Sequence, residues 1–289
     1  MPATASAFVP GHVTGFFSVH GDEDPLAAGS RGAGAALSDG VTVRVEAGAP
    51  TAVELNGERS RIEAVGNVLD RLGTTARVVC ETPLPISAGF GVSGACALGT
   101  ALAVDAAEGG GWTENQLVTI AHAAEVEAGT GLGDVVAQAR GGLPIRVEPG
   151  PPPRGRLDGL PARPRVEYVS FGGLDTGSVI GGETGSLSAA GERALSDLRE
   201  APGVGTFMAA SRQFAREADL LTDRVADAVD DVEAAGGEAA MAMLGETVFA
   251  LDGGLSAAGY DARACRTSGG ARVLDDVSAV PGGADAPRD

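Results

Sequence analysis

A glycine-rich loop in the first third of the chain constrains its fold more than any other feature. Residues 89–94 read Gly-Phe-Gly-Val-Ser-Gly, between the β-prone run ARVVCET (76–82) and an alanine-rich segment of about 93–107 with helical character. A glycine loop that opens a helix binds phosphate through free backbone N–H groups and the positive helix end. We expect Ser93 at the N-cap position of this helix. A serine there is also explained by helix capping alone, without a phosphate site.

The absence of lysine excludes two common phosphate-binding folds, because all 21 basic residues are arginine. A Walker-type P-loop needs a lysine after its last glycine, and a protein kinase needs one on its third strand. A dinucleotide-binding fold has its first glycine almost directly after the strand, whereas Pro83 and Pro85 intervene here. A hydrolase with Ser93 as nucleophile stays a weak alternative, since only three histidines could assist it.

The charge balance is strongly acidic, with 39 acidic against 21 basic residues and a net charge of −18. This excludes a nucleic-acid binder, which needs basic surface. The acid excess favours adaptation to a high-salt cytoplasm, where charges are screened, while a GC-rich genome would explain only the missing lysine. The first ten residues lack signal-peptide features and no apolar run could span a membrane, so we expect a soluble cytoplasmic protein. The three cysteines are scattered and have no CxxC spacing, so we expect neither a disulfide framework nor a zinc site.

Two sequential α+β domains are expected. The first covers 1–150, with strands at 41–47 and 76–82, a helix of about 114–128 and a long glycine-rich loop from 11 to 34. The proline-dense stretch of about 149–164 is the expected linker. The second domain covers 165–289, with helices near 188–200 and along a long apolar pattern at 207–232, a closing hairpin formed by ARACRT and ARVL, and a frayed tail at about 280–289.

The loop with its flanks, PISAGFGVSGA (85–95), resembles the PxxxGxGSSA loop of the GHMP small-molecule kinases. Further signals follow the family's order: VPGH (9–12) before the loop, then Glu125, GTGLGD (129–134) and the glycine pair 141–142. The segments PGHVTGFFSVH, DPLAAGSRGAG and AMLGETVF are most similar to the archaeal pantoate kinases of this superfamily. The resemblance spans about residues 7–251 and implies an N-terminal domain like domain 2 of ribosomal protein S5 and a ferredoxin-like C-terminal domain.

By this resemblance, Asp134 is the catalytic base, and Glu125 with Ser93 binds Mg²⁺; Glu127 is an alternative to Glu125. A base of this kind contributes about 10²- to 10⁴-fold. The resemblance also implies an ATP-binding loop, whose residues are Pro85, Gly89, Gly91, Ser93 and Gly94. Without the resemblance, Asp134 would be interpreted as a helix N-cap and Glu125 as a solvated surface charge.

The substrate end needs groups for a carboxylate and a hydroxyl. The candidates are Ser30, Arg31, His122, Arg146 and His12. An arginine can clamp a carboxylate through two hydrogen bonds, although a single arginine is as often a surface charge. The chain departs from the family pattern at Val92, where the first loop serine would stand, and in the C-terminal glycine motif, which is reduced to Met-Leu-Gly-Glu at 243–246.

The resemblance therefore implies an ATP- and Mg²⁺-dependent kinase of (R)-pantoate in archaeal coenzyme A synthesis, expected as a homodimer without nucleic-acid or membrane partners. One alternative is a GHMP kinase for another small hydroxy compound, of the homoserine or mevalonate type. The other is a non-catalytic ATP-binding sensor on the same fold, which would be expected to have lost its base or metal ligands.

Overall fold

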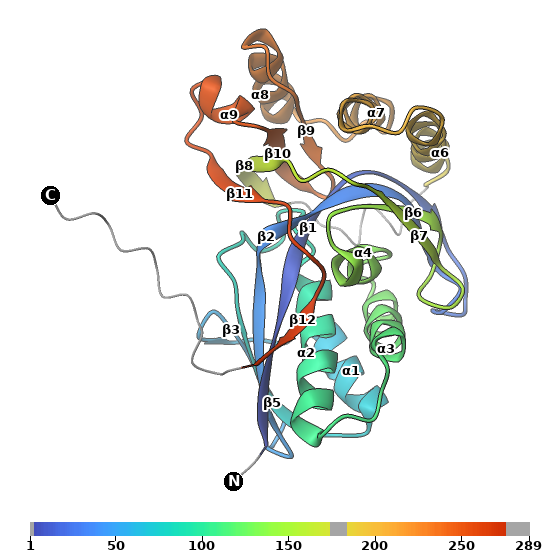
Figure 1. Ribbon diagram of the computed structural model, residues 1–289, viewed down its shortest axis with the longest axis vertical. Coiled ribbons are helices and arrows are strands. Elements are labelled where there is room, and N and C mark those ends of the chain that lie inside the picture. The colour runs from blue at the N-terminus through green and yellow to red at the C-terminus, as the bar shows by residue number, and fades with distance from the viewer. Residues whose placement is uncertain (1–2, 174–183, 276–289) are drawn as a thin grey trace, which may run out of the picture.

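The computed structural model describes residues 3–173 and 184–275, which form two sheets with helices packed on them (Figure 1). The first sheet is built on a long antiparallel pair, strands β1 (Thr4–His20) and β2 (Gly29–Ala47). One end of β2 pairs with β5 (Ala76–Glu81), and the other end pairs with β6 (Leu143–Glu148). The remaining members are β3 (Ala52–Leu55), β4 (Glu58–Arg59), β7 (Arg156–Leu160) and β12 (Arg272–Leu274).

Helices cover one face of this sheet and place the glycine-rich loop at its middle. They are α1 (Glu63–Leu72), α2 (Val92–Glu108), α3 (Glu114–Glu127) and α4 (Asp134–Arg140). Helix α2 is buried along most of its length, and small side chains allow this close packing. A Cβ atom on Gly99 would lie 2.5 Å from a methyl carbon of Val43, so the helix rests directly on β2.

The second sheet belongs to the C-terminal half and has the strand order β11-β8-β10-β9, with antiparallel pairing throughout. Its strands are β8 (Arg165–Gly173), β9 (Ala239–Ala242), β10 (Gly245–Leu251) and β11 (Arg263–Arg266). The accompanying helices are α6 (Gly185–Glu200), α7 (Val204–Glu217), α8 (Asp223–Ala234) and α9 (Gly254–Ala257). The mixed α+β architecture is confirmed, and the apolar pattern at 207–232 is divided between α7 and α8.

The loop expected at residues 11–34 was wrong, because most of this segment is the far part of the β1–β2 pair. The alternation of polar and apolar residues that is typical of a strand is absent there, because both faces of the pair are buried, between α2 or α4 on one side and the C-terminal helices on the other. Glycine is needed for close approach: Gly32 has a φ of +144°, and a Cβ atom there would lie 2.2 Å from the Phe16 carbonyl oxygen. A glycine-rich stretch is therefore strand here, not loop.

Two further predictions differ from the structure. The stretch expected to be a linker contains β7, which pairs with β6. The closing hairpin is absent from the described residues: β11 pairs with β8, while β12 (Arg272–Leu274) returns to the first sheet and pairs with β1 (Figure 1). A single cut at the linker therefore does not separate the two sheets. The tail expected at 280–289 lies outside the described residues.

The three cysteines are free and buried, in agreement with the sequence analysis. In the two ranges described, no helix has both the length and the apolar character required to cross a bilayer.

Candidate active site

The glycine-rich loop ends on Gly91, whose φ of +63° lies in the left-handed region, and α2 begins at Val92. Ser93 is the second residue of the helix, so the prediction that it is the N-cap was wrong. The cap needs a left-handed backbone, which glycine adopts without strain. Gly89 also has a positive φ, of +84°, and Pro85 precedes the loop at an exposed position.

The carbonyl groups of the loop are bonded to other parts of the chain. Three such bonds are present: Thr247 Oγ1 donates to Ala88 O (2.8 Å), His12 N donates to Phe90 O (3.0 Å), and Gln138 Nε2 donates to Gly91 O (2.9 Å). In a trans peptide the N–H group points opposite to the C=O group. The N–H groups of Gly89, Gly91 and Val92, which follow these carbonyls, therefore point away from the three donors, and backbone amides left free in this way can bind an anion.

Glu125, on α3, faces this loop with a side chain that is nearly fully buried. Its Oε2 accepts a hydrogen bond from Ser93 Oγ at 3.2 Å. Burial, and secondly the charge of Asp134, raise the pKa of Glu125 to about 7. A buried carboxylate beside a hydroxyl, next to a glycine-rich loop that opens a helix, has the oxygen donors that Mg²⁺ prefers. The residues present therefore fit a magnesium ion.

Glu127, the alternative ligand, faces elsewhere. It is exposed and forms an ion pair with Arg71 on α1. Two residues along a helix rotate a side chain by about 200°, so Glu125 and Glu127 lie on different faces of α3. The structure thus places Glu125, and not Glu127, beside Ser93.

Asp134 begins α4, and its side chain is 22% exposed. Its Oδ1 lies 2.7 Å from Nδ1 of the fully buried His12. Burial alone would raise the pKa of Asp134, but the His12 hydrogen bond and the positive charge of Arg146 outweigh it, and the pKa lies below its usual value. Burial lowers the pKa of His12, so we assign a neutral imidazole that donates from Nδ1 to an ionised Asp134.

Glycines bring Asp134 close to the loop. A Cβ atom on Gly91 would lie 3.0 Å from Asp134 Cγ, and one on Gly94 would lie 3.2 Å from a methyl carbon of Val135. The start of α4 is therefore packed against the start of α2. The carboxylate proposed as base and the amides that would hold phosphate stand next to each other.

A small pocket, partly open to solvent, adjoins Asp134. Arg146 on β6 and Ser30 on β2 line it, and Arg146 Nε donates to Ser30 Oγ at 3.2 Å. Arg146 is almost completely buried, which lowers its pKa to about 10, and its Nη1 atom has no hydrogen-bond partner. A buried guanidinium with a spare donor is suited to bind an anionic group of a ligand.

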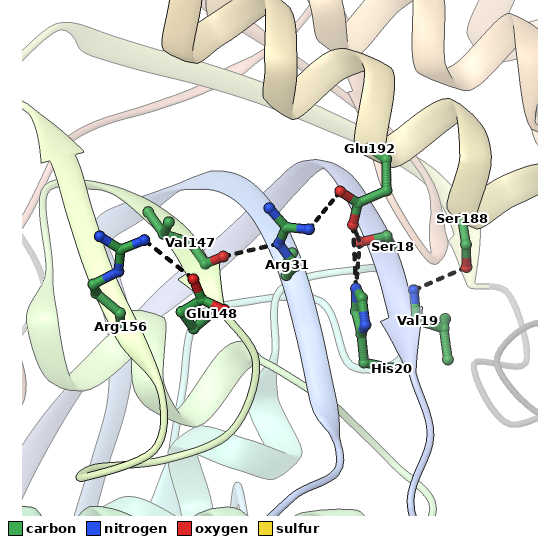
Figure 2. A network of polar contacts seen from close by, with 9 residues as sticks. All are labelled: Ser18, Val19, His20, Arg31, Val147, Glu148, Arg156, Ser188 and Glu192. Carbon is green, nitrogen blue, oxygen red and sulfur yellow. Dashed lines mark hydrogen bonds and ion pairs between the residues drawn. The ribbon is translucent and has the colours of Figure 1, made fainter.

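The other two candidates at the substrate end are held by the protein itself. His122 is buried and bonded to the Ala28 carbonyl oxygen (3.0 Å), just before β2. Arg31 donates from Nε to Val147 O (2.8 Å) and pairs with Glu192 on α6 (2.6 Å). Figure 2 shows Glu192 reaching from α6 to this end of β1 and β2, where it also contacts Ser18 and His20. A direct role of His122 or Arg31 at a substrate stays a prediction.

Sequence reasoning did not single out Gln138, Thr247 or Leu244 as site residues. Leu244 lines the pocket together with Thr14, Phe17 and Leu132, which were also missed. Gln138 could have been found, because it lies one helical turn after Asp134 and so shares its face. Thr247 and Leu244 come from the C-terminal sheet, more than 100 residues from Asp134, and no spacing in the sequence indicates that contact.

Comparison with known proteins agrees with this geometry. Residues 60–142 match the family model described as GHMP kinases N terminal domain. The pantoate kinase of Thermococcus kodakarensis is 35% identical over 261 residues, covering 85% of this chain and 86% of the relative. A solved structure described as a phosphotransferase related to the CoA biosynthesis pathway superposes with a TM-score of 0.85 at 31% identity, covering 95% of this chain and 99% of the other. A homoserine kinase from Cytophaga hutchinsonii shares the fold at 16% identity, with a TM-score of 0.66 and coverages of 95% and 98%.

Proposed function

The chain belongs to the pantoate kinase family of the GHMP superfamily, and we propose that it transfers the γ-phosphoryl group of ATP to the 4-hydroxyl of (R)-pantoate in coenzyme A synthesis. The observation that carries this proposal is the buried Arg146, which has an unpartnered Nη1 and lines the same pocket as Asp134. Pantoate has a carboxylate at one end and a primary alcohol at the other. Arg146 would bind the first group and Asp134 would receive the proton of the second.

The expected mechanism uses positioning and proton transfer. The 4-hydroxyl oxygen forms a bond to the γ-phosphorus while the bond from that phosphorus to the bridging oxygen of ADP breaks, and the hydroxyl proton passes to Asp134. The hydrogen bond from His12 keeps Asp134 ionised and oriented before transfer. The loop amides would hold the phosphates. Glu125 and Ser93 would hold Mg²⁺, which supplies charge neutralisation at the phosphates.

Two alternatives give different outcomes in the same assay. A GHMP kinase for another small hydroxy compound would use the same loop and base. A non-catalytic ATP sensor would bind nucleotide without turnover, although Asp134, Glu125 and Ser93 are all present here. The free Nη1 donor of Arg146 favours an acceptor that carries a carboxylate. Pantoate, homoserine and mevalonate all carry one, so the acceptor has to be identified by experiment.

We also propose a cytoplasmic, salt-adapted homodimer. The support for salt adaptation is the net charge of −18, which repels the anions ATP and pantoate at low ionic strength. At about 1 M salt the screening length is about 3 Å, so activity should rise steeply toward molar KCl. A salt-independent rate would contradict this part of the proposal, and sedimentation at high salt tests the dimer.

The decisive experiment measures ADP release by the purified protein with Mg²⁺-ATP in about 2–3 M KCl, a salt range chosen to screen the acidic surface. Pantoate, homoserine, mevalonate and no acceptor are compared. Release with pantoate alone supports the proposal. ADP release with another acceptor supports a kinase with a substrate other than pantoate. Nucleotide binding without any turnover favours the non-catalytic sensor.

A further inference from the structure

Leu244 stands in the short turn between β9 and β10, and its backbone is in the left-handed region with a φ of +68°. A positive φ at the second central residue of a turn is usually taken by glycine or asparagine, because a Cβ atom is strained there. The turn is held in place by a hydrogen bond from Met243 N to Thr14 O of β1, at 2.9 Å. A leucine in such a position calls for a reason beyond the turn itself.

The position of Leu244 in the pocket lining provides that reason. Leu244 lines the same pocket as Asp134 and Arg146, and it is the member that comes from the C-terminal sheet. Phe17 and Leu132 line the pocket as well, so apolar residues accompany the two charged ones. A pocket that combines apolar side chains with a cation and a base suits a ligand with a bulky apolar centre between an acid and an alcohol.

We propose that Leu244 is a specificity-determining residue that contacts the geminal dimethyl carbon of the acceptor. This inference rests on the proposed function, since pantoate has a quaternary carbon between its carboxylate end and its 4-hydroxyl. The same contact disfavours acceptors that lack the two methyl groups. The strained backbone is retained because a glycine in the turn would leave that carbon without an apolar partner.

A merely structural role makes different predictions. Leu244 is partly buried and touches the hydrophobic core, so loss of packing alone would lower stability and affect all acceptors alike. A specificity role changes the ratio between acceptors. Leu244→Gly separates the two, because glycine removes the side chain but also relieves the positive φ.

The test compares kcat/KM for pantoate and for 2,4-dihydroxybutanoate, which lacks the methyl groups, in the wild type, Leu244→Gly and Leu244→Asn. Asparagine tolerates the left-handed backbone and presents a polar group. Leu220→Ala is the control, as a partly buried leucine of the same half whose position is outside the pocket lining. Thermal unfolding is measured for every variant.

We expect the wild-type preference for pantoate to fall at least about tenfold in both Leu244 variants, since one methylene in an apolar pocket discriminates about 10- to 200-fold. The unfolding temperature of Leu244→Gly should be at or above that of Leu220→Ala. The preference of Leu220→Ala for pantoate over 2,4-dihydroxybutanoate should equal that of the wild type. An unchanged preference in the Leu244 variants overturns the inference and leaves the kinase proposal intact. A wild type that turns over neither acid overturns both.

Discussion

The imidazole of His12 and the carboxylate of Asp134 form a 2.7 Å hydrogen bond between β1 and the first residue of α4, 122 residues apart in sequence. His12 also donates its backbone N–H to the carbonyl oxygen of Phe90 in the glycine-rich loop. One residue of β1 therefore contacts both the proposed base and the proposed phosphate site. This explains how the two are held in register although they belong to different helices.

Removing the His12 side-chain donor should move the acid limb of the pH–rate profile. The folded pKa of Asp134 is lowered because the His12 hydrogen bond and the positive charge of Arg146 together outweigh burial, so without His12 the effect of burial grows and the pKa rises. His12→Leu should therefore lose activity at a higher pH than the wild type does. His12→Asn, whose amide can replace the Nδ1 donor, should restore part of the shift. Identical acid limbs in all three proteins would contradict the assigned role of the pair.

Asp134→Asn should remove most turnover while nucleotide binding is retained. The amide preserves the shape of the side chain but cannot accept the hydroxyl proton, and such a base contributes about 10²- to 10⁴-fold to the rate. Single-turnover kinetics and a direct ADP-binding titration separate the two effects. Wild-type turnover in this variant would exclude Asp134 as the base.

Loss of the Arg146 guanidinium should chiefly raise the KM for pantoate. A hydrogen bond to a charged group contributes about 1.5 to 3 kcal/mol, so Arg146→Met should raise this KM about ten- to a hundredfold. The KM for ATP should change little. Arg140→Met is the matched control, because Arg140 lies at the end of the same helix as Asp134, bonds to the Gly141 carbonyl oxygen and is outside the lining of the Asp134 pocket. An effect confined to ATP would contradict the assignment.

The local part of the site could be predicted from the sequence, and the part built by distant segments could not. The loop, the start of α4 and Glu125 are encoded within about 50 consecutive residues, where glycine spacing and helix periodicity are informative. Residues 11–34 misled the prediction because glycine there serves close packing of two buried strands. Leu244 and Thr247 reach the site only through the pairing of β9 and β10, and that register is not readable from local spacing.

Metal-free Glu125→Gln should be more stable than the wild type at pH 8 but not at pH 4.5. The folded pKa of Glu125 is raised to about 7 by burial, so the native state binds this proton more tightly than the unfolded state does. The protonated Glu125 stabilises the native state below the unfolded pKa, and this contribution is lost as pH rises to about 7. The difference between the folded and the unfolded pKa corresponds to about 3 kcal/mol. Glutamine stays neutral and avoids this loss.

Denaturation at several pH values, in EDTA and constant salt, measures that difference. Glu127→Gln is the control, since Glu127 is an exposed glutamate of the same helix that lies away from Ser93. A Glu125→Gln difference that does not grow between pH 4.5 and 8 would show that this carboxylate is not held in a desolvated site.

Thr247→Val should weaken nucleotide binding without a matching effect on pantoate. Thr247 donates from β10 to the Ala88 carbonyl oxygen, and a Cβ atom on Gly245 would lie 2.2 Å from that same oxygen, so the C-terminal sheet supports the loop directly. Valine keeps the shape but leaves a buried carbonyl without its donor, which changes the orientation of the Gly89 amide. One hydrogen bond contributes about 1 kcal/mol, so the KM for ATP should rise several-fold.

Thr247→Ser keeps the hydroxyl and should restore the KM for ATP, which a general loss of packing would not allow. Thr100→Val is the matched control: Thr100 is equally buried, but it bonds to a carbonyl oxygen of its own helix, α2. It should lower the unfolding temperature by a similar amount and leave both KM values unchanged. If Thr247→Val changes only stability, the C-terminal sheet supports the fold but the Thr247 hydrogen bond does not set the conformation of the loop.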